Sequence, residues 1–179
     1  MTEDHLFQPL ISLLSSDDPD LQAQGLELAT ALDDFEVWTQ LSRLVHVSEE
    51  GWLSSELFPI SVALSVVIQS GVLDDCTTLK ISDAEVAHLD DLHVLTQLTH
   101  LDLTGCAALR SVPIESLQRL ESLALSGCGQ LEDFDLGVLE TLVELDLSEC
   151  RQLKRIDLNQ YPRLVALDLS GCRSLTEII

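Results

Sequence analysis

The residues best suited to chemistry in this sequence are its cysteines, because four of the five recur at a fixed interval. Cys106, Cys128, Cys150 and Cys172 follow one another every 22 residues, and Cys76 stands apart from them. A thiolate zinc site or a disulfide would be the reactive alternatives. However, the sequence has no C-x-x-C pair, and an evenly spaced column cannot surround a tetrahedral ion. We therefore predict a structural ladder of buried, reduced thiols that act as small apolar side chains, with no metal.

Other residue patterns give no support for catalysis. The sequence contains no phosphate-binding loop, no nucleophile elbow and no H-E-x-x-H motif. The histidines do not group with a nucleophile at any familiar spacing; they are His5, His46, His88, His93 and His100. We predict no catalytic residue and no cofactor, and an enzyme is the weakest of our three hypotheses.

The cysteines belong to a larger repeat. Four segments with a common apolar skeleton, LTHLDLTGCAAL, LESLALSGCGQL, LVELDLSECRQL and LVALDLSGCRSL, begin at Leu98, Leu120, Leu142 and Leu164. One period earlier, residues 76–97 keep the apolar positions, although Ala84 replaces the cysteine. We therefore predict a degenerate repeat at 76–97, repeats at 98–119, 120–141 and 142–163, and a partial repeat at 164–179.

The pattern L-x-x-L-x-L-x-x-C-x-x-L resembles the leucine-rich-repeat family, and its L-S-G-C form is similar to repeats in plant intracellular immune receptors and in some bacterial proteins. In L-x-L, two apolar side chains point into the core while the residue between them faces solvent. The resemblance implies an α/β solenoid: a right-handed stack with a parallel β-sheet on its concave face and a short irregular or 3₁₀ convex side. It also implies that the cysteine lies inside the turn and supports the backbone as it leaves the strand.

Residues 1–75 lack the repeat and carry helix signals instead, so we predict an all-α N-terminal cap. Pro19 follows two aspartates and suits the first position of a helix. Asp33 and Glu36 form a capping box for a second helix. The apolar segment 57–73 is too short and too interrupted to span a membrane and is better explained as a buried helix.

The N-terminal region is predicted to cover the apolar edge of the first repeat, because solenoids need capping for solubility. Both tryptophans, Trp38 and Trp52, are predicted to lie in the core.

The charge balance restricts the choice of partners. Nine lysines and arginines stand against 31 aspartates and glutamates, which gives a formal net charge of −22. Such a chain repels phosphate backbones and anionic lipids, so we predict neither a nucleic-acid partner nor a membrane. The N-terminus carries acids where a signal peptide needs bases, which predicts a cytoplasmic location.

Family resemblance implies that the concave face binds protein, through the residues that point outward from the strands. We predict that the partner contacts His100, Asp102, Thr104, Ser122, Ser126, Glu144, Asp146, Ser148, Asp168 and Ser170. Asp146 and Asp168 occupy adjacent turns about 5 Å apart, where a lysine or arginine of a partner would relieve their repulsion. The alternative is that these residues only make the surface soluble.

Most of the basic residues lie in the later turns and define a basic flank: Arg110, Arg151, Lys154, Arg155 and Arg173. This flank could bind a partner, or it could pair with Glu132, Asp133 and Asp157, and we favour pairing because mixed charges are normal on a surface.

The leading hypothesis is a non-enzymatic protein-interaction module whose partner has a basic surface. The second is a regulatory or targeting fragment of a larger signalling or effector protein, because the last repeat stops after 16 of its 22 positions. Its leucines would then present an uncovered apolar end, which predicts self-association, a continuation of the chain, or fraying.

Overall fold

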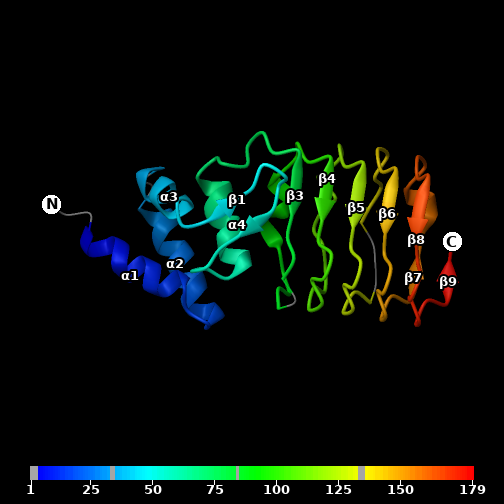
Figure 1. The fold of residues 1–179 in the computed structure, drawn as a ribbon, viewed down its shortest axis with the longest axis horizontal. Coiled ribbons are helices and arrows are strands. Elements are labelled where there is room, and N and C mark those ends of the chain that lie inside the picture. Colours follow the sequence, from blue (N-terminus) through cyan, green and yellow to red (C-terminus); the bar gives the residue numbers. More distant parts are fainter. Residues whose placement is uncertain (1–3, 33–34, 84, 133–135) are drawn as a thin grey trace. The chain divides into compact units, whose positions relative to one another are not determined.

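The computed structural model describes residues 4–32, 35–83, 85–132 and 136–179. The chain forms two compact units. The first unit comprises residues 1–48 and 53–73, and the second comprises residues 49–52 and 74–179. Figure 1 shows helices in the first unit and a row of strands in the second.

The first unit is mainly helical. Its elements are α1 (Asp4–Leu14), α2 (Pro19–Ala31), α3 (Phe35–Ser42), α4 (Ile60–Gln69) and an antiparallel pair of short strands, β1 (His46–Val47) and β2 (Leu53–Ser54). Pro19 begins α2 as predicted, and the side chain of Asp18 accepts a hydrogen bond from the backbone N–H of Asp20 at 2.9 Å. The N-cap side chain thus satisfies an amide that the first helical turn leaves unpaired.

A single apolar cluster holds these helices together. It includes Leu10, Leu14, Leu41 and Val62, and Trp38 is only 7% exposed within it. The helical N-terminal region and the core position of Trp38 are therefore confirmed. The strand pair β1–β2 and helix α1 were not predicted, and the capping box involving Asp33 lies outside the described residues.

The second unit is built around a parallel sheet of five strands, which stand side by side in Figure 1. They are, in spatial order, β3 (Thr78–Lys80), β4 (His100–Asp102), β5 (Ser122–Ala124), β6 (Glu144–Asp146) and β8 (Ala166–Asp168). Each residue pairs with the residue 22 positions later, as Leu79 does with Leu101 and Leu145 with Leu167. The 22-residue period read from the sequence is therefore the register of the sheet, and strand β3 follows the same register.

The other side of the solenoid is short and irregular, as the 22-residue period predicts. Its described residues include the 3₁₀ helices η1 (Asp90–Val94) and η2 (Leu158–Gln160). Two further short strands, β7 (Arg155–Ile156) and β9 (Glu177–Ile178), pair in parallel across the last two turns. Short return segments allow the turns to stack closely and to share one core.

Inward leucines of neighbouring turns form that core. Leu101, Leu123 and Leu145 are at most 2% exposed, whereas their counterpart Leu167 in the last turn is only half-buried. Val165 is 85% and Ile178 57% exposed. The outer side of the last turn is therefore apolar and accessible in the described chain. No helix of the described residues is long and apolar enough to cross a membrane.

Candidate functional site

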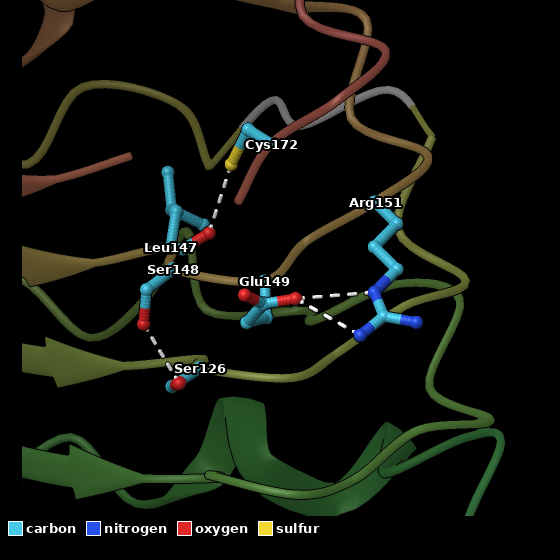
Figure 2. A network of polar contacts seen from close by, with 6 residues as sticks. All are labelled: Ser126, Leu147, Ser148, Glu149, Arg151 and Cys172. Atoms are coloured by element: carbon cyan, nitrogen blue, oxygen red, sulfur yellow. Dashed lines mark hydrogen bonds and ion pairs between the residues drawn. The ribbon is translucent and has the colours of Figure 1, made fainter. Parts of the chain in front are cut away.

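The cysteine ladder lies inside the turns, directly after the strands. Cys106, Cys128 and Cys150 are fully buried, and Cys172 in the last turn is half-buried. Each thiol donates a hydrogen bond to a backbone carbonyl of the preceding turn, at Sγ–O distances of 3.5, 3.3, 3.2 and 3.0 Å to Ile81, Leu103, Leu125 and Leu147 in order. Figure 2 shows the last of these bonds, from Cys172 to Leu147. The ladder therefore links successive turns.

Burial keeps these thiols protonated. All five cysteines are free thiols. Burial raises the pKa of the Cys150 thiol to about 12 and also raises the pKa of Cys128. A protonated thiol is a poor nucleophile and a poor metal ligand. In the described residues, no group of three or more histidine, cysteine or acidic side chains is arranged to hold a metal ion.

One turn departs from the L-S-G-C pattern at the residue before its cysteine. Glu149 occupies this position with φ of 58°, where Gly105, Gly127 and Gly171 adopt similar positive values. A left-handed backbone disfavours a residue that has a Cβ atom. The Glu149 carboxylate accepts hydrogen bonds from Nε and Nη2 of Arg151 at 3.1 and 3.0 Å, as Figure 2 shows. The ion pair therefore accompanies a strained backbone position.

The outward residues of the sheet strands lie on one face, which we call the concave face. The register aligns His100 with Ser122 and Glu144, and it aligns Asp146 with Asp168. Of the ten residues predicted to contact a partner, the exposed ones are His100, Thr104, Glu144, Asp168 and Ser170. The half-buried ones are Asp102, Ser122, Ser126, Asp146 and Ser148.

The aspartates on this face have a structural role that the sequence analysis did not predict. The Oδ1 atoms of Asp102, Asp146 and Asp168 each accept a hydrogen bond from the backbone N–H two residues later, at 3.0, 2.8 and 2.8 Å. The bonds from Ser170, led by its backbone N–H, lower the pKa of Asp168. Both aspartates of the last two turns therefore fix the exit from their strand, and the lowered pKa of Asp168 keeps that carboxylate charged at neutral pH.

Hydroxyl residues within and after the strands form hydrogen bonds between neighbouring turns. The hydroxyl of Ser148 donates to Oγ of Ser126 at 2.7 Å, as Figure 2 shows. Ser122 donates to Oε2 of Glu144 at a longer 3.4 Å. Some hydroxyl groups of the face are therefore already hydrogen-bonded within the chain, and these bonds link neighbouring turns.

Two residues of the basic flank, Lys154 and Arg151, form ion pairs with glutamates of the described chain. Nζ of Lys154 lies 2.8 Å from Oε2 of Glu132, one turn away, as predicted. The hydrogen bond from Lys154 lowers the pKa of the Glu132 carboxyl. Arg151 pairs with Glu149, which the sequence analysis did not expect, and Asp133 lies outside the described residues.

Trp52 does not lie in the core, and the prediction that it does was wrong. Its side chain is 38% exposed. Trp52 forms a parallel bridge with Lys80 at the open edge of β3, and Nζ of Lys80 lies 5.4 Å from the centroid of its ring. Sequence reasoning missed this position because Trp52 precedes Lys80 by 28 residues, which is not a multiple of the period.

A parallel sheet in 22-residue register, inward leucines and an internal thiol ladder together define a leucine-rich-repeat solenoid. Residues 62–172, more than half of the chain, match the family model described as the leucine-rich-repeat domain of the endo-beta-N-acetylglucosaminidase EndoS. The chain belongs to this family of leucine-rich-repeat domains, and the predicted recognition and fold class are confirmed.

The chain is similar to a solved structure titled "Functional domain of InlJ from Listeria monocytogenes includes a cysteine ladder", with 23% identity and a TM-score of 0.38. The similarity covers 59% of this chain and 27% of the InlJ chain, so this chain spans well under half of that structure. No curated protein matches the sequence.

Proposed function

We propose that this protein is a non-enzymatic interaction module, and that the concave face binds a protein partner with a basic surface. The observation that carries the proposal is the alignment of Asp146 with Asp168 in adjacent strands, beside the exposed Glu144. In the described part of the chain, no basic side chain lies within ion-pair distance of these aspartates. Like charges held side by side on rigid strands favour a partner that brings a cation.

The test must separate the charge of the aspartates from their structural role. Asparagine keeps an oxygen that can accept the bond from the backbone N–H but removes the negative charge. We therefore expect the double variant Asp146→Asn with Asp168→Asn to fold normally. Its affinity for a short peptide carrying two lysines should fall by about threefold per charge, in line with exposed ion pairs.

Asp157→Asn is the matched control. Its Oδ1 also accepts a backbone N–H bond two residues later, at 3.0 Å, but Asp157 does not belong to the sheet strands. The titration is followed by amide chemical shifts on the isotope-labelled full chain, with shifts expected at β6 and β8. Equal affinity of all three proteins, or shifts that avoid the concave face, would contradict the proposal.

A second role is that the solenoid serves a larger protein as a regulatory or targeting module. The family description supports it, because the matched model is one domain of a glycosidase. In that setting the repeats would place an activity that resides elsewhere. The same lysine peptide tests only the concave face. Fusion to a reporter enzyme, followed by comparison of its distribution with that of the Asp146→Asn, Asp168→Asn fusion, tests the targeting role.

A further inference from the structure

The concave face is longer than the repeats alone would make it. The backbone N–H of Lys80 donates to the carbonyl of Gly51 at 2.7 Å, so Gly51 and Trp52 lie along the outer edge of β3. Gly51 has φ of 87°, and a Cβ atom there would lie 2.3 Å from the carbonyl oxygen of Thr78. Only glycine permits this close approach. The segment therefore extends the sheet at the edge opposite to β8.

This extension adds an aromatic side chain to the concave face. The side chain joins the column of outward residues that contains Lys80 and Asp102, which we call the middle column. Residues paired in register point to the same side of a sheet. Trp52 therefore shares the outward side with Lys80, in agreement with the 5.4 Å contact between the ammonium and the ring. A partly exposed tryptophan held on a rigid edge and next to a cation is a common anchor for protein partners.

The middle column consequently changes its chemistry from one edge of the sheet to the other. Its members, in spatial order, are Trp52, Lys80, Asp102, Ala124, Asp146 and Asp168. In the register of the sheet, Lys80 lies next to Asp102. Asp146 lies between Ala124 and Asp168, so neither of these two aspartates has a cation beside it in the column. The column is thus aromatic and cationic at one end and anionic at the other.

We propose that the concave face binds an extended protein segment in a single orientation. An apolar residue and a carboxylate of the segment lie over Trp52 and Lys80, and its basic residues lie over Asp146 and Asp168. This inference rests on the proposed function and adds the partner's charge order to it. Four strand spacings separate Trp52 from Asp146, about 19 Å, which about six residues of an extended chain span.

The charge order disfavours two simpler occupants of the whole face. A uniformly basic segment would place a cation against Lys80, and a uniformly acidic one would place anions against Asp146 and Asp168. Either arrangement brings like charges together, which is unfavourable on a shared surface. A segment with separated charges satisfies both ends of the column.

The experiment uses the isotope-labelled full chain and two synthetic peptides of about eight residues, a length that covers the span. The bipolar peptide has a leucine and a glutamate at one end, a serine and glycine spacer, and two lysines at the other end. The lysine peptide replaces the leucine and glutamate with glycine and serine. A nitroxide label is placed at either end of the bipolar peptide, and paramagnetic broadening of protein signals reports its position.

The expected result has three parts. The label at the lysine end broadens the amides of Asp146 and Asp168, and the label at the other end broadens the indole N–H of Trp52. The bipolar peptide binds several-fold more tightly than the lysine peptide. Lys80→Met, which keeps an unbranched apolar side chain, reduces this advantage to what the leucine gains over Trp52 and does not lower the affinity for the lysine peptide.

The two possible failures are distinct. If both peptides bind at β6 and β8 with equal affinity, or if each label broadens both edges, the single orientation is wrong and the proposed function stands. If neither peptide perturbs the concave face, the proposed function fails as well.

Discussion

Gly127 provides the most direct test of how each strand turns into its loop. It adopts φ of 77°, and a Cβ atom added there would meet nothing closer than 3.8 Å. Replacement by alanine therefore introduces no clash, and its effect comes from the left-handed backbone alone. That conformation costs about 1–2 kcal/mol for a residue with a Cβ, partly offset by about 0.4–1 kcal/mol because alanine restricts the unfolded chain. We expect Gly127→Ala to lower the free energy of unfolding by about 1 kcal/mol.

Gly129, two residues later in the same loop, is the matched control. A Cβ atom there would also have space, with its nearest neighbour at 3.9 Å, and its φ is not in the left-handed region. Gly129→Ala should therefore be neutral or stabilise by up to about 1 kcal/mol. Both variants are compared by urea unfolding followed by circular dichroism. If the two alanines change the unfolding midpoint equally, backbone strain does not govern this turn.

The same reasoning applies in reverse to Glu149. Glu149→Gly relieves the left-handed strain but loses the ion pair with Arg151. The side chain of Arg151 is 63% exposed and that of Glu149 is 48% exposed. An exposed pair contributes about 0–1 kcal/mol, so the two effects nearly cancel. We expect the free energy of unfolding to change by less than about 0.5 kcal/mol. A large loss would show that the ion pair contributes much more than its exposure allows.

Four further substitutions test the ladder and the last turn. Cys128→Ala removes a buried thiol and its bond to Leu103 and should cost about 1–2 kcal/mol in urea unfolding, more than Cys172→Ala at its half-buried position. Since burial raises the pKa of Cys150 from 9.0 to about 12, the folded chain keeps that proton longer than the unfolded chain. Stability is therefore fully present below pH 9 and falls as the pH rises towards 12, and Cys150→Ala should flatten this decline in the unfolding midpoint. For the exposed apolar end, light scattering over a concentration series should show association of the native chain that Val165→Lys abolishes; a monomer at all concentrations would contradict it.

The repeated part of the fold could be predicted because one spacing determines both core and register. Leu101 and Leu123 occupy equivalent positions in successive turns, so the 22-residue period places them opposite each other in the sheet. The N-terminal part has no such period. Helix α1 was missed because Pro9 lies inside it, where a proline usually ends a helix.

The candidate site was predictable to a similar degree. Alternation along each strand identifies the outward residues, and this is why Asp146 and Asp168 appear side by side. The position of Trp52 depends on a segment outside the repeats that joins the edge of β3 through Gly51. Such a contact is long-range and follows no period, and only the glycine that permits the close approach marks it in the sequence.

The structural role of the aspartates on the concave face is compatible with the proposed binding role. The turn after β5 forms with Ala124 in the same column, and its register matches that of the neighbouring turns. The turn therefore does not require a side-chain acceptor, and where one is present an amide oxygen would serve as well as a carboxylate. What a carboxylate adds at Asp146 and Asp168 is charge, and between two adjacent strands that charge is repulsive in the isolated chain. A cation supplied by a partner would convert this repulsion into attraction, and this is the physical reason why the proposed binding would make the two charges favourable.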